Sequence, residues 1–231
     1  MFSAETYAKR RAELRRRIGS GLILLPGNYE APMNYPNNAY NFRQDSTFLY
    51  FFGQSLPALA GVIDADSGAE TLYGDDFTVE DIIWMGPQPS VADLAAEVGV
   101  SQSRPMAALA ADLRHALAQG RKVHYLPPYR GETTLQISQL LGIVPSMVHD
   151  RMSLDLLFAV AEMREVKSDE ELACIEEAFN IGYHMHTTAM RMCRAGRSEH
   201  EIAGAVDGVA MSYGTGVSFA TILSQHGEVL H

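Results

Sequence analysis

The chain has 231 residues, 47% of them hydrophobic, and a formal net charge of −10. This length and composition suffice for one large domain or two smaller ones. The acidic balance disfavours nucleic acid as the main partner, because duplex binding needs Lys and Arg to neutralise phosphates. No stretch approaches the roughly 20 apolar residues that cross a bilayer, and the charged start is unlike a signal peptide, so we expect a cytoplasmic protein without membrane association. Cys174 and Cys193 are too sparse for a disulfide framework or a zinc knuckle, and we expect packed thiols.

The first 53 residues predict a helix, a buried strand, a loop and a second strand. Tyr7, Leu14 and Ile18 form the apolar side of the first helix. Its solvated side is expected to carry the basic run Lys9, Arg10, Arg11, Arg15, Arg16 and Arg17. The apolar run GLILLPG, residues 21–27, is typical of a buried strand, and a polar loop follows to residue 41. Residues 48–52 are then expected to form an aromatic strand that ends at Gly53.

Helix and strand patterns continue to alternate after Gly53. The stretch AGVIDADSGAETLYG predicts two strands joined through Asp66-Ser67-Gly68, which is a strong hairpin signal. Helical periodicity covers residues 91–98, 106–117 and 133–141, and KVHYL, residues 122–126, indicates another strand. The fold class predicted for residues 1–160 is therefore α/β, with a mixed sheet.

The pattern changes after residue 160. Ser168 and Glu171 form a capping box at the start of one long amphipathic helix. Its apolar positions step by three or four: Leu172, Ile175, Phe179, Tyr183, His186, Met190 and Cys193. Ser198 and Glu201 open a second helix, and VSFATIL, residues 217–223, predicts a strand. Because that strand has no visible partner, residues 161–231 are expected to be the start of a truncated second domain.

Metal-binding patterns in the sequence are weak. His184 and His186 are two apart on a helix and cannot chelate one ion as an i, i+4 pair could. His200-Glu201 lacks the second histidine of H-E-x-x-H, and Glu201 is already explained as a capping residue. The acidic residues Asp75, Asp76, Glu80 and Asp81 could hold a cation, but solvated or helix-capping roles are the more common ones. We assign no metal ligand.

Four motifs, in order, resemble a known family. FRQDSTFLYFFG is similar to the R-Q-x-S-x-F-x-Y-x-x-G signature of the N-terminal domain of aminopeptidase P and its relatives prolidase and creatinase. EMREVKSDEELACIEEA resembles the junction that opens their catalytic domain, and CRAGRSEHEI and SFATILSQHGEVLH continue the likeness. The resemblance implies a creatinase/aminopeptidase P-type domain over residues 1–160. It also implies an incomplete domain of pita-bread fold over residues 161–231.

The resemblance also implies a site. Leu230-His231 matches the L-H of a strand in which the family's histidine hydrogen-bonds substrate beside the metals, so His231 is the expected catalytic residue. The preceding SQHGEV departs from the family pattern, which makes His226 a second candidate, although a loop surface is favoured for it. The family's two Asp, one His and two Glu ligands for two divalent ions, usually Mn²⁺, lie further along. This chain is therefore expected to bind no metal tightly and to be inactive alone.

Two further residues have alternative roles. Trp84, in DIIWMGP, resembles a family tryptophan that reaches a neighbouring subunit's active site, which implies substrate contact in a homo-oligomer; a buried core position is the alternative. Arg43 and Asp45 are expected to be a structural pair that ties the loop to the sheet.

The resemblance implies that the intact protein is a metallopeptidase that releases the N-terminal residue from Xaa-Pro peptides. Prolidase activity on Xaa-Pro dipeptides is the nearest alternative within the family. A non-catalytic pita-bread-like module that binds a basic peptide or protein is the alternative from another class, and the net charge of −10 would suit it.

Overall fold

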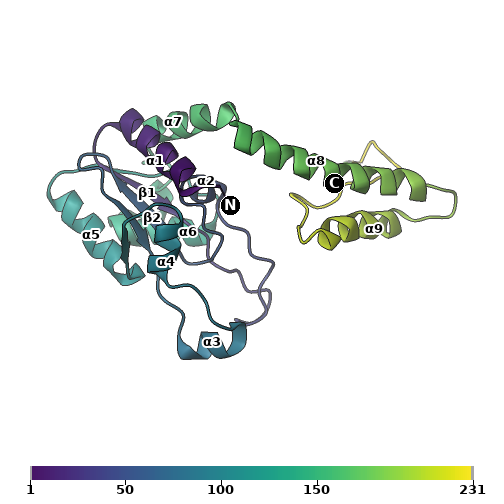
Figure 1. The fold of residues 1–231 in the computed structure, drawn as a ribbon, viewed down its shortest axis with the longest axis horizontal. Coiled ribbons are helices and arrows are strands. Elements are labelled where there is room, and N and C mark those ends of the chain that lie inside the picture. Colours follow the sequence, from purple (N-terminus) through teal and green to yellow (C-terminus); the bar gives the residue numbers. More distant parts are fainter. Residues whose placement is uncertain (1, 230–231) are drawn as a thin grey trace. The chain divides into compact units, whose positions relative to one another are not determined.

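The structure is a computed structural model that describes residues 2–229, and it divides into two compact units, residues 1–165 and 166–231. The expected domain boundary at residue 160 falls inside the last helix of the first unit. The helices of the first unit are α1 (Ala4–Ile18), α2 (Ser46–Phe52), α3 (Val79–Met85), α4 (Val91–Glu97), α5 (Met106–Ala118), α6 (Gly131–Leu141), the 3₁₀ turn η1 (Pro145–Met147) and α7 (Leu154–Glu165). The second unit contains α8 (Asp169–Met192) and α9 (Glu199–Ser212) (Figure 1).

A five-stranded mixed sheet organises the first unit, in the order β4-β3-β2-β1-β5. The strands are β1 (Leu22–Pro26), β2 (Ala60–Asp64), β3 (Glu70–Tyr73), β4 (Gln102–Arg104) and β5 (Val123–His124). The three central strands are antiparallel to one another, and the β1–β5 and β3–β4 pairs are parallel. The predicted α/β class with a mixed sheet is therefore confirmed, as is the hairpin through residues 66–68.

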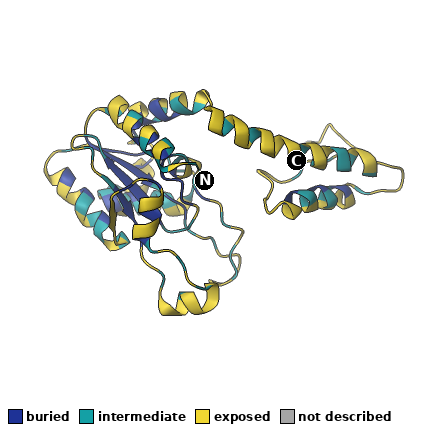
Figure 2. Ribbon diagram, viewed as in Figure 1, coloured by how far each residue is buried: buried dark blue, intermediate teal, exposed yellow. Residues whose placement is uncertain are grey.

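Both faces of the sheet are covered, and β1 shows how (Figure 2). Its alternate residues enter different cores: Ile23 and Leu25 pack with side chains from α1, α2, α4 and α7, whereas Leu22 and Leu24 pack with α5 and α6. Side chains alternate between the faces of a strand, so a continuous apolar run is the pattern that a strand buried on both faces requires.

Residues 48–52 are helical, so the predicted aromatic strand is wrong. Asp45 caps α2 by accepting hydrogen bonds from the N–H groups of Thr47 and Phe48 at 2.9 and 2.8 Å. Phe48, Phe51 and Phe52 are fully buried on one side of that helix. Spacing by three and four residues, together with a capping aspartate, outweighs the strand propensity of the aromatic residues.

Two arginines of the basic run in α1 are buried, which corrects the prediction of a fully solvated side. Arg11 is 0% exposed and donates to Glu70 Oε2 at 2.7 Å and to the carbonyl oxygens of Phe51 and Val98 at 2.9 and 2.8 Å. Arg10 is 8% exposed and lies over the ring of Tyr50 at 4.0 Å. Arg11 lies between Tyr7 and Leu14 in the i, i+4, i+7 series, so it belongs geometrically to the apolar side.

The second unit is a helical hairpin followed by a tail. The Ser168–Glu171 and Ser198–Glu201 capping boxes form as predicted, and α8 spans 24 residues. Among residues 166–229, the buried side chains are Ile202, Val206 and Ala210, all on α9. Both cysteines are exposed, so their assignment as packed thiols is wrong. Residues 217–223 form no strand, because no neighbouring strand supplies hydrogen bonds to them.

Candidate functional site

The expected catalytic His231 and its neighbour Leu230 lie outside the described residues. The described segment that leads to them is the tail over residues 214–229, which is attached to α9 at three places. The Thr215 hydroxyl donates to the carbonyl oxygen of Ala210 at 3.0 Å. The Thr221 hydroxyl donates to Asp207, and the Gln225 N–H donates to Glu199 Oε1, both at 2.5 Å. Polar side chains of α9 thus hold the segment that precedes His231.

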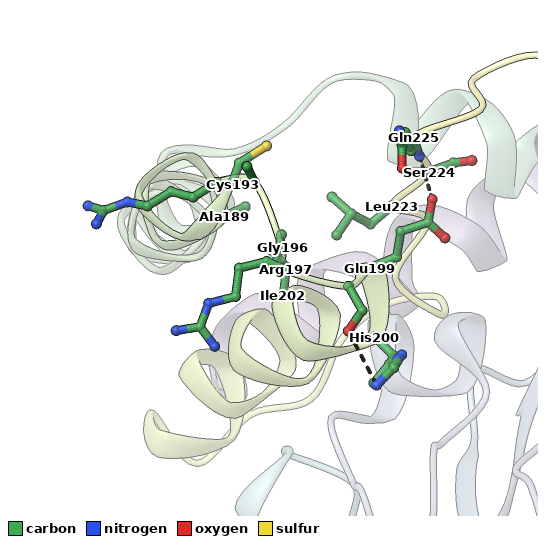
Figure 3. Close-up of a pocket in the computed structure, with 13 residues that line it drawn as sticks. Ala189, Cys193, Gly196, Arg197, Glu199, His200, Ile202, Leu223, Ser224 and Gln225 are labelled. Atoms are coloured by element: carbon green, nitrogen blue, oxygen red, sulfur yellow. Dashed lines mark hydrogen bonds between the residues drawn. The ribbon is translucent and has the colours of Figure 1, made fainter.

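A hollow of about 830 Å³ lies where α8 ends, α9 begins and the tail returns (Figure 3). It is lined by Ala189, Cys193, Arg194, Ala195, Gly196, Arg197, Ser198, Glu199, His200, Ile202, Leu223, Ser224 and Gln225. Figure 3 shows the Glu199 carboxylate reaching the tail at Gln225. The Nε2 atom of His200 lies 3.3 Å from the Ser198 hydroxyl. The polar groups of this hollow therefore mainly organise the turn and the tail.

The N-terminus of α9 is electrostatically satisfied from within the chain. Hydrogen bonds from the backbone N–H and the hydroxyl of Ser198 hold the pKa of Glu201 below its ordinary value, and Arg197, at 3.2 Å, adds to this effect. The ionised Glu201 completes the capping box and lies at the positive end of the helix dipole. His200-Glu201 is thus explained as capping, as the sequence indicated.

The remaining histidines of the second unit are dispersed. The ring of His184 stacks on Tyr213 with centroids 6.1 Å apart. His186 lines a second hollow of about 440 Å³ between α8, α9 and the tail. His226 pairs with Glu228 at 3.3 Å on an exposed loop. In the part of the chain that the structure describes, no three His, Cys, Asp or Glu side chains come together. These residues do not fit a two-metal site by themselves.

Three of the four acidic residues considered as cation ligands, Asp75, Asp76 and Asp81, cap helices. Asp75 accepts from the N–H of Met106 at 3.1 Å, and Asp76 accepts from the N–H of Val91 at 2.7 Å. Asp81 accepts from both the hydroxyl and the N–H of Thr78, and these bonds lower the pKa of Asp81. Each carboxylate is therefore committed to a different helix start. The T-x-x-D pattern of residues 78–81 was the sequence signal for α3, which the periodicity did not predict.

Trp84 lies on α3 and is 82% exposed, which excludes the buried core position that was its alternative role. No residue of this seven-residue helix is buried. Its other large apolar side chains, Val79, Ile82, Ile83 and Met85, are exposed as well. The structure thus presents Trp84 to solvent within a short apolar helix.

The loop before α2 is held mainly by a residue that the sequence did not single out. Gln44 accepts from the N–H of Asn28 at 2.7 Å and donates to the carbonyl oxygen of Leu56 at 2.7 Å. Asp45 caps α2, and Arg43 contributes its carbonyl oxygen to Asn28 Nδ2 at 2.9 Å. The Gln of the R-Q motif is therefore the side chain that joins the loop to the end of β1.

Comparisons with known proteins agree with this architecture. The family described as the N-terminal domain of aminopeptidase P matches residues 7–125, and the chain belongs to that family. A probable Xaa-Pro aminopeptidase of Paracoccidioides brasiliensis is 26% identical over 219 residues, covering 92% of this chain and 45% of the relative. A probable Xaa-Pro aminopeptidase of Aspergillus flavus is 27% identical over 235 residues, covering 99% of this chain and 46% of the relative. The chain thus spans somewhat less than half the length of these curated relatives.

Solved structures share the fold. A zinc-substituted Escherichia coli aminopeptidase P in complex with product has a TM-score of 0.75 and 23% identity, covering 92% of this chain and 50% of that one. The same enzyme with the inhibitor Pro-Leu has a TM-score of 0.74 and the same identity and coverage. Among the described residues, no helix of this chain is both long and apolar enough to span a membrane.

Proposed function

We propose that the chain is the N-terminal part of a metalloaminopeptidase that releases the N-terminal residue from Xaa-Pro peptides. The proposal rests on how much of this chain aligns with Xaa-Pro aminopeptidases. The alignment with one Xaa-Pro aminopeptidase covers 99% of this chain, so it includes the helical hairpin and the tail as well as the family domain. A likeness confined to residues 7–125 would have supported a shared accessory domain only.

His231 is proposed to donate a hydrogen bond to the substrate oxygen on which negative charge develops. A donor of this kind typically contributes about 2.7–4 kcal/mol to transition-state stabilisation. The contacts of Thr221 and Gln225 with α9 support the proposal, because they anchor the segment that precedes His231. A donor acts efficiently only when its backbone is held in place.

The divalent ions, Mn²⁺ in our proposal, would polarise the carbonyl group before proline when bound. Their ligands would come from residues beyond those described here, because the described residues do not fit such a site. Both cysteines are free thiols, which suits the proposed cytoplasmic location.

Trp84 is proposed to contact the substrate bound to a neighbouring subunit of a homo-oligomer. Its 82% exposure supports this, since a tryptophan held in a core could not reach another chain. A seven-residue helix is also too short to be stable in water unless other groups pack on it.

The test uses the intact longer protein with Mn²⁺ and two substrates, an Xaa-Pro dipeptide and an Xaa-Pro tripeptide. Cleavage of the tripeptide supports the proposal, and cleavage of the dipeptide alone would identify a prolidase instead. Stable folding with neither activity nor stoichiometric metal would indicate a non-catalytic binding module. His231→Ala should lower kcat by about a hundredfold or more at unchanged stability. His226→Ala is the matched control and should leave kcat unchanged.

The role of Trp84 needs its own comparison. Trp84→Ala should raise KM for the tripeptide, whereas Val79→Ala, a 76% exposed position on the same helix, should not. Equal effects of the two substitutions would assign Trp84 to subunit assembly rather than to substrate contact.

A further inference from the structure

Tyr50 contacts the last turn of α7, from which the chain leaves the first unit. The Tyr50 hydroxyl donates to the carbonyl oxygen of Met163 at 3.0 Å, although the two residues are 113 positions apart in the sequence. The guanidinium groups of Arg10 on α1 and Arg164 on α7 lie over the Tyr50 ring, at 4.0 and 5.6 Å from its centre. A cation over an aromatic ring is attracted to it. Tyr50, on α2, therefore joins α7 to α2 and, through Arg10, to α1 (Figure 1).

The carbonyl group that Tyr50 contacts is one that α7 itself leaves without a partner. The last four carbonyl oxygens of an α-helix accept no hydrogen bond from within the helix. Because α7 ends at Glu165, the carbonyl oxygen of Met163 is one of these four. The Tyr50 hydroxyl therefore acts as a cap that a distant helix supplies. Arg164 is the basic residue of the same turn, and its charge is favourable at the negative end of the helix dipole.

Side-chain packing supports this cap. Tyr50 and Met163 are both partly buried against the core cluster that includes residues of α1 and α2. The ring of Phe51 meets the Tyr50 ring edge-on, with centroids 4.9 Å apart. The neighbouring ion pair of Glu162 with Arg17 adds little, because Glu162 is 65% exposed. The contacts of Tyr50 are thus the ones that oppose fraying of the last turn of α7.

The chain enters α8 only three residues after α7 ends, and the start of α8 has its own cap. In the capping box, the N–H of Glu171 donates to the Ser168 hydroxyl oxygen at 3.3 Å, and the N–H of Ser168 donates to Glu171 Oε2 at 2.9 Å. Val166, the first residue after α7, is 78% exposed. Residues 166–167 therefore lie between two capped helix ends, and the division of the chain into its two units falls beside them, after residue 165.

We propose that residues 166–167 are the hinge between the two units and that Tyr50 fixes where this hinge begins, by holding the last turn of α7. A hinge consists of a few residues at the ends of elements that absorb backbone rotation while the flanking helices stay intact. Unwinding of the last turn of α7 would extend the flexible stretch to residues 162–167. Its longest span would then grow from about 7 to about 21 Å. The inference depends neither on the proposed peptidase function nor on what covers α8, because it uses only the contacts of α7 and the first turn of α8.

Hydrogen exchange of the 231-residue chain tests the role of Tyr50. Tyr50→Phe keeps the ring beneath both guanidinium groups and removes only the hydroxyl. The amides of residues 163–165 should then exchange about fivefold faster, because a hydrogen bond that opposes local opening is lost. Tyr125→Phe is the matched control, since the Tyr125 hydroxyl donates to the carbonyl oxygen of Val148 at 2.8 Å. It should leave the exchange of residues 163–165 unchanged.

The amides of β1 provide the internal reference for this experiment. They exchange through unfolding of the whole first unit, so they should exchange faster in both variants. Circular dichroism confirms that both variants keep their helices. Equal acceleration at residues 163–165 in the two variants would mean that the end of α7 opens only together with the whole unit. That result, or unchanged exchange of residues 163–165 in Tyr50→Phe, would overturn the proposal.

Limited digestion with trypsin tests where the hinge lies. Lys167 is in the proposed hinge, whereas Arg164 is in the last turn of α7. In the unmodified chain, cleavage after Lys167 should be faster than cleavage after Arg164, because proteases cut where the backbone is already unwound. Tyr50→Phe should raise cleavage after Arg164 relative to Lys167, and Tyr125→Phe should leave this ratio unchanged. Mass spectrometry of the fragments identifies the two sites. Faster cleavage after Arg164 in the unmodified chain would place the hinge inside α7 and contradict the proposal.

Discussion

The two units of this chain differ in how much of their helices is buried. In the first unit, every strand of the mixed sheet except β4 and most of the helices contribute buried side chains, and even an arginine is fully enclosed. In the second unit, the 24-residue α8 has no buried residue, and the buried side chains among residues 166–229 all lie on α9. The capping box and the apolar periodicity of α8 thus define its helix, although none of its residues is buried.

This difference in burial predicts that the two units differ in stability and in how they unfold. Most helical stability in proteins comes from packing of an apolar face, so the first unit should unfold cooperatively with a well-defined free energy of unfolding. The second unit should open locally at low cost unless another surface covers α8. The substitutions below pair a buried position of the first unit with an exposed position, and the last experiment compares two shortened chains.

The largest contrast is expected between two phenylalanines. Phe51→Ala, at a position 0% exposed, should lower the free energy of unfolding of the first unit by about 3–5 kcal/mol, through lost burial and a cavity. Phe179→Ala, at a position 65% exposed, should change the stability of the chain by less than about 0.5 kcal/mol. Urea denaturation followed by circular dichroism measures both, and similar losses would contradict the contrast.

Arg11 provides the next test. Arg11→Met should lower the free energy of unfolding by about 3–5 kcal/mol, because Glu70 and the carbonyl oxygens of Phe51 and Val98 lose their donor inside the protein. Arg16 lies five residues further along α1, and its side chain is 70% exposed, so Arg16→Met should leave the stability unchanged. Equal effects would mean that the buried network adds nothing beyond surface charge.

His124 makes the first unit sensitive to acid. Its Nε2 donates to the carbonyl oxygen of Ser20 at 3.1 Å, so in the neutral ring Nδ1 accepts from the Ser153 hydroxyl at 2.7 Å. Burial, with a smaller contribution from Lys122, holds the pKa of His124 below its ordinary value of 6.5.

The unfolded chain therefore takes up this proton at a higher pH than the folded one. The free energy of unfolding should fall as the pH drops below about 6.5 toward the folded pKa, by at most about 1.4 kcal/mol per pH unit. His124→Gln should flatten this dependence, whereas His226→Gln, on the exposed loop of the second unit, should leave it intact. Urea midpoints of the unsubstituted chain and of both variants, measured between pH 5 and 7.5, test this prediction.

The smallest effect is expected from removing the second unit. A chain ending at residue 165 should keep the melting temperature of the first unit within about 2 °C. A chain ending at residue 160 should melt earlier, because it loses the Met163 carbonyl oxygen that accepts from the Tyr50 hydroxyl at 3.0 Å and Glu162, which pairs with Arg17 at 2.6 Å. Equal melting temperatures would mean that the domain ends at residue 160.

The sequence predicted the elements whose signals are local. Apolar runs closed by turn residues located β1 and the β2–β3 hairpin, and Ser168 and Ser198 located the starts of both long helices. The α2 helix was mistaken for a strand because aromatic residues favour strands in general, whereas Asp45 and the spacing of three phenylalanines decide the local structure.

The family and its implied site also followed from sequence, because they rest on motifs in a fixed order. Their geometry did not: His231 falls outside the described residues, and only the contacts of the tail with α9 bear on its placement. For Trp84, the sequence left a core position and a surface position open. Solvent exposure is a property of the folded chain, and the structure excluded the core position.

By itself, then, the sequence determined the α/β class, the capped helices and the family. Periodicity and capping depend on residues close together in sequence, and the family is recognised from motifs in a fixed order. The tertiary structure alone decided which charges are buried and which apolar side chains are exposed. Arg11 and Arg15 belong to the same helix and the same basic run, yet only Arg11 meets Glu70 and two carbonyl oxygens from distant segments. Phe179 has the apolar character of Phe51, yet no segment of the described chain covers it. Burial depends on contacts between residues far apart in sequence, and local patterns do not contain them.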